Sequence, residues 1–193
     1  MVHVTYLKSA LFVVIAYVLA HGLTAFLITP VQSRILPDIT AFASLVYLPH
    51  GVRVLATWLM GWSAVPALIV GGFLSEVLFT PEGITNVQSP VMLASILVGA
   101  ISAVLAFEVM RFLGHRLYAG QTLRIHWKWL LLVGVIASIL NSIGQSIVFS
   151  AEILTGHALA VLAAYAVGDL VGLSVTTLIL MLVFRWMRLS GRG

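Results

Sequence analysis

The sequence has no cysteine and very little charge, and each absence narrows what the chain can be. Without cysteine it forms no disulfide and offers no thiolate ligand to a metal. Charged residues make up 8% of the 193 residues, whereas soluble domains contain roughly a quarter. Apolar residues make up 61% and recur in runs near the ~20 residues that cross a bilayer. This composition excludes soluble enzymes and nucleic-acid binders and indicates an integral membrane protein.

Motifs for catalysis and for metal binding are also absent. The sequence contains no Gly-x-Ser-x-Gly elbow, no P-loop and no Ser-x-x-Lys pattern. Its histidines do not follow the spacing of metal ligands, and no carboxylates stand at ligand spacing beside them. We therefore expect no enzyme activity, no cofactor and no metal.

The apolar runs that are present predict an all-α, polytopic transmembrane bundle of about six helices, formed as one integral membrane domain over residues 1–193. The second run contains Pro49 and Gly51, which remove a helix donor and add a flexible residue at mid-span. We expect this span to be broken or re-entrant at Pro49 and Gly51. The predicted spans are 10–28, 39–60, 64–79, 91–113, 129–149 and 159–184.

Basic residues are distributed asymmetrically along the chain. The stretch 111–128 carries four Lys or Arg residues, and the stretch after the last span carries three further ones. The predicted outer turns, 80–90 and 152–157, carry none. Because Lys and Arg accumulate on the cytoplasmic side of membrane proteins, we expect a multi-pass protein of the inner (plasma) membrane with both termini in the cytoplasm. A role of these basic residues in binding lipid headgroups or a partner is the alternative.

Ionisable residues inside apolar spans are candidates for a functional site, because an unpaired charge at membrane depth costs several kcal/mol. Arg53 follows His50 by three residues, which places both on one helix face. Asp169 lies near the middle of the last span, between Gly168 and Gly172. Their opposite charges and similar depth predict an Arg53–Asp169 pair. Such a pair either belongs to a ligand site or only locks two helices together.

Three further polar residues extend this candidate site. Glu76 has no local partner and stands near the outer end of its span, where an outward-facing pocket would end. Asn141 and Gln145 are spaced i, i+4 and form a polar stripe that either bonds neighbouring helices or faces a ligand. Glu108, by contrast, stands one turn from Arg111, and a pair there needs no ligand. The predicted ligand-binding residues are His50, Arg53, Glu76, Asn141, Gln145 and Asp169.

Two segments resemble a family of bacterial signalling proteins. Residues 47–56, Tyr-Leu-Pro-His-Gly-Val-Arg-Val-Leu-Ala, are similar to the opening motif of the membrane-associated sensor domain found at the N-termini of histidine kinases and diguanylate cyclases. Residues 168–172 resemble that family's later Gly-Asp-x-x-Gly. The resemblance implies a membrane input module. Family members usually carry a cytoplasmic output domain, whereas this chain stops a few residues after its last predicted span, so we expect it to act through a separate partner protein. The matching positions are Pro49, Gly51, Gly168, Asp169 and Gly172.

Size and topology support a second interpretation. Substrate-binding subunits of energy-coupling-factor vitamin transporters resemble this chain in length, span number and lack of soluble domains. They bind a small molecule in an outward-open pocket and depend on a separate ATPase module. Both interpretations imply a helical bundle in the lipid bilayer that takes a small polar or anionic ligand and acts through a separate signalling or coupling protein, with no nucleic-acid partner.

Overall fold

The computed structural model of the chain describes residues 2–40, 44–80, 89–121, 127–149 and 158–190. These ranges are almost entirely helical and contain no strand, so the predicted all-α bundle is confirmed. The elements in chain order are α1 (Val2–Leu23), η1 (Thr24–Ile28), α2 (Thr29–Ile35), α3 (Pro37–Thr40), α4 (Leu48–Met60), η2 (Gly61–Ala64), α5 (Val65–Phe79), α6 (Pro90–Phe112), α7 (Trp127–Val148) and α8 (Ala158–Ser190).

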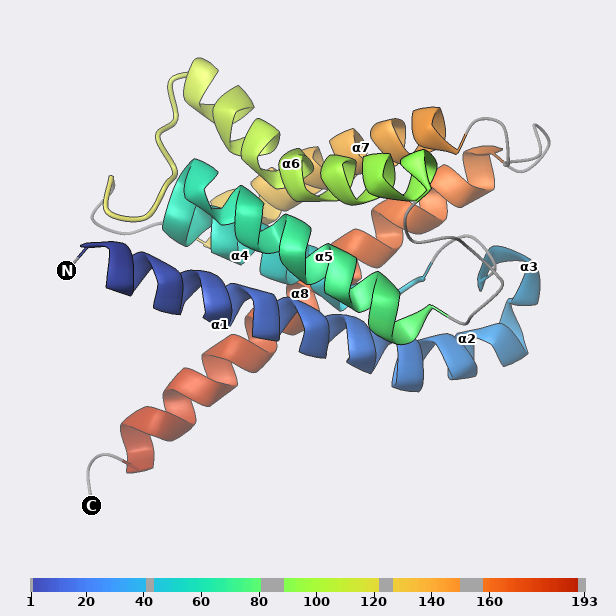
Figure 1. Cartoon of the computed structure of the whole chain (residues 1–193), viewed down its shortest axis with the longest axis horizontal. Coiled ribbons are helices and arrows are strands. Elements are labelled where there is room, and N and C mark those ends of the chain that lie inside the picture. Colours follow the sequence, from blue (N-terminus) through green and yellow to red (C-terminus); the bar gives the residue numbers. More distant parts are fainter. Residues whose placement is uncertain (1, 41–43, 81–88, 122–126, 150–157, 191–193) are drawn as a thin grey trace.

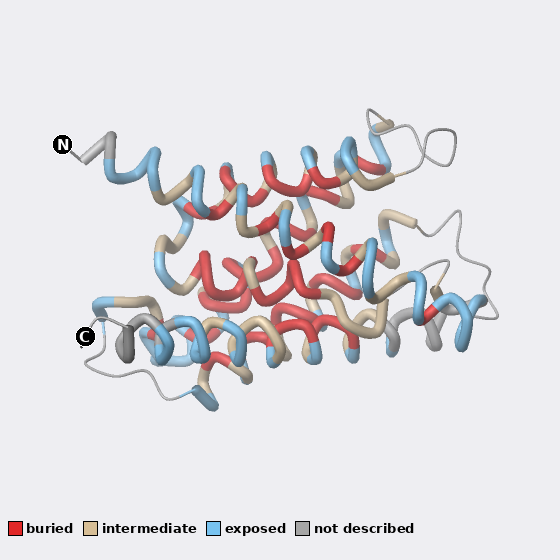
Figure 2. Tube along the Cα trace, turned by 90° about the horizontal axis from the view of Figure 1, so that it is seen from below, coloured by how far each residue is buried: buried red, intermediate tan, exposed pale blue. Residues whose placement is uncertain are grey.

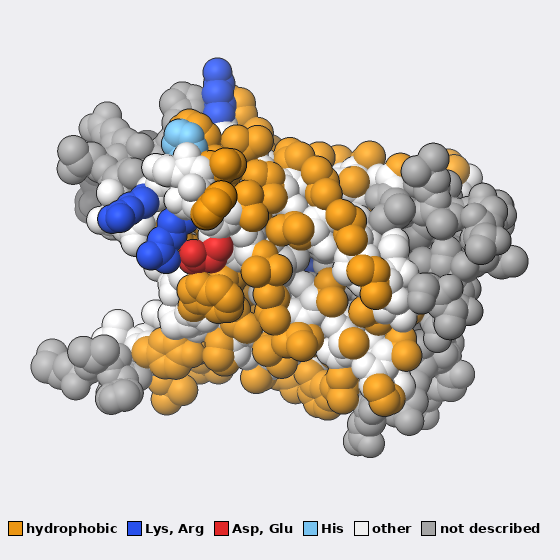
Figure 3. All heavy atoms as spheres, turned by 90° about the horizontal axis from the view of Figure 1, so that it is seen from above, with side chains coloured by type: hydrophobic (Ala, Val, Ile, Leu, Met, Phe, Trp, Pro, Cys, Tyr) orange, Lys and Arg blue, Asp and Glu red, His pale blue; other side chains and the backbone are white. Residues whose placement is uncertain are grey.

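The outer surface of the bundle is apolar. Figure 3 shows hydrophobic side chains over most of one face, with Lys, Arg and Glu gathered at one end. Large side chains such as Phe12 and Phe26 are 70% and 71% exposed. A soluble monomer rarely exposes a continuous apolar surface of this kind, whereas a bilayer solvates it. Five helical segments are long and apolar enough to cross a membrane: Thr5–Ile35, Leu48–Phe79, Pro90–Phe112, Trp127–Val148 and Tyr165–Val183.

The N-terminal helix is longer than the sequence predicts. It continues from α1 through η1, a π-helical turn, into α2, so helix extends well beyond the predicted end at residue 28. Pro30 removes a backbone donor, and the wider π turn stands immediately before it. The chain therefore passes the proline without ending the helix.

The second apolar run contains a shorter helix than predicted. Residues 44–47 are not helical, and α4 begins only at Leu48. Pro49 therefore stands in the first helical turn, where a missing N–H costs nothing. α4 itself is unbroken through Gly51, so the interruption precedes the proline instead of following it. α4 ends at Gly61, whose φ of +60° lets the chain reverse through η2 into α5.

Helix α4 is the central element of the bundle. It lies against α8 and α1, while α5 packs on α1, and α7 packs on both α6 and α8 (Figure 1). Most of its residues are buried, and Figure 2 shows the buried part of the chain gathered between the outer helices. It also joins two apolar cores, because Val54 packs with α6, α7 and α8 and Ala56 packs with α1 and α5. The C-terminal part of α8 leaves the bundle (Figure 1).

The segment 44–47 lies directly on α8. Tyr47 donates its backbone N–H to the Gly168 carbonyl at 2.9 Å. A Cβ at Gly168 would overlap the Ser44 carbonyl oxygen, and one at Gly172 would overlap the Tyr47 carbonyl oxygen. Both glycines are therefore required because backbone meets backbone at these two points.

Candidate functional site

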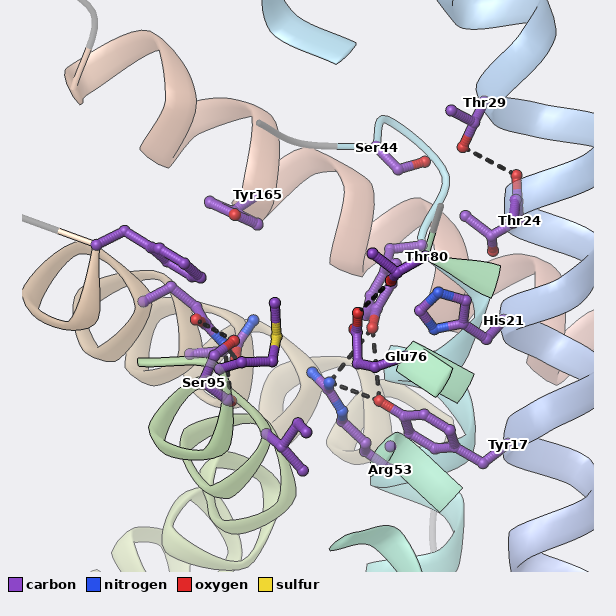
Figure 4. Close-up of a pocket in the computed structure, with 18 of the residues that line it drawn as sticks. Tyr17, His21, Thr24, Thr29, Ser44, Arg53, Glu76, Thr80, Ser95 and Tyr165 are labelled. Carbon is purple, nitrogen blue, oxygen red and sulfur yellow. Dashed lines mark hydrogen bonds between the residues drawn. The ribbon is translucent and has the colours of Figure 1, made fainter. Parts of the chain in front are cut away.

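A polar cavity of about 410 Å³ lies among the helices (Figure 4). This volume is in the range of small-molecule sites. The cavity reaches the ends of α5 and α7 and the start of α6, whereas Glu108 and Arg111 stand at the other end of α6. The residues that line it come from all eight described α-helices, from η1 and from the segment 44–47, and Thr80 and Phe149 mark where it reaches the helix ends. Its uncharged polar lining consists of hydroxyl and amide side chains: Thr24, Thr29, Thr40, Ser44, Tyr17, Tyr47, Thr80, Ser95, Asn141, Gln145 and Tyr165.

The late start of α4 creates one wall of this cavity. Non-helical backbone inside a membrane protein needs partners from other elements. Thr24 of the π turn accepts the Leu48 N–H at 3.3 Å, and the Gln32 side chain accepts the Leu45 N–H at 2.7 Å. These two contacts and the Tyr47–Gly168 bond stabilise the segment 44–47 in its non-helical conformation. In this conformation the Tyr47 side chain lines the cavity.

Arg53 is a buried cation without a carboxylate partner. The residue is 6% exposed, and its Nη2 donates to the Tyr17 hydroxyl at 2.6 Å and to the Tyr47 hydroxyl at 3.4 Å. Its Cζ lies 5.5 Å and 5.3 Å from the centres of these two rings, within cation–π distance. Nε and Nη1 have no hydrogen-bond partner, and no ion pair joins Arg53 to a carboxylate in the described part of the chain.

The predicted Arg53–Asp169 pair is not formed as a direct contact, although the Asp169 charge acts on the guanidinium through space. Asp169 pairs with His50 instead, at 3.4 Å from His50 Nδ1 to Asp169 Oδ2, and accepts a hydrogen bond from Asn141 at 3.1 Å. The Arg53 guanidinium turns toward α6, where Gly99 leaves the space that it occupies. The similar depth and opposite charges of Arg53 and Asp169 do not determine which face of α4 is turned toward α8. In the structure His50 is on that face, and the Arg53 side chain is directed to α6.

His50 and Asp169 form a buried contact between α4 and α8. His50 is 0% exposed and Asp169 is 1% exposed. Both ring nitrogens of His50 face acceptors, since Nε2 lies 3.3 Å from the Gly134 carbonyl oxygen and Nδ1 faces Asp169. Asp169 therefore has His50 and Asn141 as its contacts, and no ion pair joins it to Arg53 among the described residues.

Glu76 faces the same cavity from α5. Its Oε2 accepts the Thr80 hydroxyl at 2.7 Å, one helical turn further along. The part of the chain that the structure describes places no Lys, Arg or His nitrogen at ion-pair distance from it. Figure 4 shows Arg53 and Glu76 reaching toward the same space, with His21 beside Glu76 and stacked on Phe79 at 5.7 Å. The cavity thus holds one cation and one anion that do not pair.

The Asn141–Gln145 stripe both joins helices and lines the cavity. Gln145 accepts a hydrogen bond from the Ser95 hydroxyl at 2.9 Å and donates to the Ser95 carbonyl oxygen at 3.1 Å, which ties α7 to α6. Asn141 ties α7 to α8 through Asp169. Both side chains also belong to the cavity wall. The two interpretations of the stripe are therefore compatible.

Of the predicted residues, Arg53, Glu76, Asn141 and Gln145 line the cavity, while His50 and Asp169 do not. Sequence reasoning missed Tyr17 and Tyr47, which hold the guanidinium. A tyrosine in the middle of an apolar run is the available signal, because a buried hydroxyl needs a partner.

The opposite end of the bundle carries the predicted Glu108–Arg111 contact, which is confirmed at 3.3 Å. Glu108 also accepts hydrogen bonds from Trp62 at 3.1 Å and from Tyr118 at 2.8 Å. Burial and the hydrogen bond to Glu108 raise the pKa of Tyr118 well above its usual range. This cluster fastens the turn at Gly61 to the end of α6. The Glu108 carboxylate is compensated by Arg111, so the cluster needs no ligand.

Among the described residues no group of three His, Asp or Glu side chains is arranged to hold a metal ion. No family model, no curated protein and no solved structure matches the chain. Fold and site alone therefore define its class, which is a multi-pass α-helical membrane protein with a polar cavity built around a buried arginine.

Proposed function

We propose that the protein is a sensory or ligand-binding membrane module that takes a small polar ligand with an anionic group into this cavity and acts through a separate partner protein. The observation that carries the proposal is Arg53, a buried guanidinium with two nitrogens without a hydrogen-bond partner and, in the part of the chain that the structure describes, no carboxylate at ion-pair distance. A buried charge without compensation costs several kcal/mol, and an anionic ligand removes that cost. The planar donor fork of arginine suits carboxylate or phosphate.

Residues of the sensor-like motifs support a signalling role, because they lie where α4 meets α8. Gly51 packs on Thr176 of α8, and Gly168 and Gly172 receive the segment 44–47. Arg53 stands on α4, two residues beyond Gly51. An anion that binds Arg53 would therefore change the forces on α4 close to where it packs on α8. The part of α8 that leaves the bundle could transmit this change to a partner.

The alternative function is the substrate-binding membrane subunit of an energy-coupling-factor-type transporter. The observation that favours it is the cavity itself, whose volume and hydroxyl-rich wall suit capture of a solute. Genes beside this one discriminate between the two functions. A neighbouring ATPase with a membrane coupling subunit favours transport, and a kinase or cyclase without its own input domain favours sensing.

Binding at Arg53 is tested by substituting it. We expect acetate, succinate, glutamate or inorganic phosphate to raise the melting temperature of the detergent-solubilised wild-type chain. A ligand at about 100 times its Kd stabilises by about 2.7 kcal/mol, which corresponds to several degrees. Arg53→Gln should abolish the shift and should be at least as stable as the wild type without ligand, because it removes an uncompensated charge.

Arg111→Gln is the matched control, since Arg111 is exposed at the opposite end of the bundle. It should keep the full ligand shift. A shift that persists in Arg53→Gln, or the absence of any shift with all four anions, contradicts the proposed function.

The membrane arrangement that goes with this function has six crossings. Reversal at Gly61 makes α4 and α5 a hairpin, so the segment 44–47 with α4 counts as one broken span and α5 as the next. Six crossings place both termini and the basic stretch 111–128 on the cytoplasmic side of the plasma membrane, as the positive-inside rule requires.

Cysteine labelling tests this topology without background, because the chain has no native cysteine. Asn86→Cys, at a position outside the described residues, should react with a membrane-impermeant maleimide in intact cells. Gln121→Cys, exposed beyond the end of α6, should react only after permeabilisation. Labelling of both positions from the same side excludes the six-crossing arrangement.

A further inference from the structure

Two opposite charges share the cavity without pairing, and this feature specifies the ligand more closely. We propose that the ligand is a zwitterion of the α-amino-acid type, with its carboxylate on Arg53 and its ammonium group at Glu76. This inference rests on the proposed function, because it assigns the substrate class of the same site.

The first observation is that neither charge has a counterion at ion-pair distance among the described residues. Arg53 donates only to tyrosine hydroxyls, and Glu76 receives only the Thr80 hydroxyl among the described residues. Two such charges in one cavity of about 410 Å³ attract each other. They nevertheless form no ion pair: Arg53 lies against the rings of Tyr17 and Tyr47, and Glu76 accepts the Thr80 hydroxyl.

The second observation is that a simple anion or a simple cation compensates only one of the two charges and therefore binds more weakly than a ligand that carries both. An anion compensates Arg53 but meets the carboxylate of Glu76, and a cation compensates Glu76 but meets the guanidinium. Like charges brought together in a desolvated site cost several kcal/mol. A ligand that carries both charges compensates both residues at once, and its carboxylate fits the two unused nitrogens of Arg53.

The third observation is the nature of the other walls. Thr24, Ser44 and Ser95 present hydroxyls, and Asn141 and Gln145 present amides. Such groups suit a hydrated, polar molecule, whereas sites for drug-like apolar ligands are lined mainly by hydrophobic side chains. Figure 4 shows Ser95 and Tyr165 on one side of Arg53 and Glu76, and Thr24 and Thr29 on the other side, beyond His21.

The experiment uses the full chain in detergent at pH 8, where the imidazole of free histidine is neutral. Pools of the protein amino acids are screened by thermal shift, and the amino acid with the largest shift is titrated calorimetrically. Its methyl ester, which keeps only the ammonium group, and its deaminated acid, which keeps only the carboxylate, are titrated in parallel. We expect the intact amino acid to bind on the order of 10–100-fold more tightly than either.

Glu76→Gln separates the two ends of the ligand. It should weaken the amino acid on the order of 10–100-fold, yet leave the deaminated acid unchanged or bind it more tightly, because the repulsion is gone. Glu108→Gln, which removes a carboxylate at the far end of the bundle, should change none of these affinities.

The outcomes distinguish the two proposals. If the deaminated acid binds the wild type as tightly as the amino acid, the zwitterion inference is overturned while the proposed function stands; this comparison does not depend on any variant folding. An unchanged amino-acid affinity in Glu76→Gln overturns it as well. If binding survives Arg53→Gln, or if neither amino acids nor carboxylates bind, the proposed function itself fails.

Discussion

Gly168→Ala should lower the free energy of unfolding by about 3 kcal/mol or more, the upper end of what overpacking costs. The added Cβ would overlap the carbonyl oxygen of Ser44, a backbone atom that no rotamer change can move aside. To relieve this overlap the segment 44–47 would have to move away from α8, which would break the bond from the Tyr47 N–H to the Gly168 carbonyl. Gly172→Ala should act in the same way through the Tyr47 carbonyl oxygen. Thermal unfolding in detergent, followed by circular dichroism, measures both losses.

Gly72→Ala is the control for the loss of a glycine inside a helix. Its Cβ would lie 3.1 Å from the Ile96 Cγ2 methyl, the tip of a side chain. Alanine also favours helix by about 1 kcal/mol over glycine. We therefore expect little change at this position. If Gly168→Ala unfolds at the wild-type temperature, the segment 44–47 does not pack on α8.

The apolar runs and the polar, proline and glycine residues between them were enough to predict a helical bundle. The ends of α6 and α7 lie close to the predicted ones. The start of α4 was not predicted, because residues 39–47 are as apolar as a span. What keeps 44–47 from being helical is a set of partners distant in sequence: Thr24, Gln32 and Gly168. Hydrophobic periodicity does not register such partners. Pro49 was the available signal, since proline favours the first turn of a helix.

The candidate site was predictable in its members and not in its pairing. Intramembrane charge identified Arg53 and Glu76, and i, i+4 spacing identified Asn141 and Gln145, all of which line one cavity. The partner of Asp169 depends on how α4 is rotated against α8, and this rotation places His50 there. The tyrosines that hold Arg53 come from α1 and from the non-helical segment, so their convergence required the tertiary fold.

Asp169→Ala should cost about 3–5 kcal/mol of stability, the range for removing one member of a buried pair. The loss would strand His50 Nδ1 and the Asn141 amide, both of which face Asp169 Oδ2. His50→Ala should be destabilising for the same reason, because it leaves the carboxyl uncompensated. In the double variant neither charge remains, so the combined loss should fall short of the sum by about 0.5–3 kcal/mol.

The cycle between Arg53 and Asp169 provides the comparison, because these two residues interact only through space. Arg53→Gln combined with Asp169→Ala should come closer to the sum of the single effects than His50→Ala combined with Asp169→Ala. All variants are measured by thermal unfolding under one detergent condition, without added anions, so that ligand stabilisation does not enter. A coupling larger for Arg53 than for His50 would mean that Asp169 compensates the guanidinium after all. The cavity would then have no unpaired cation, and an anionic ligand would lose its principal recognition element.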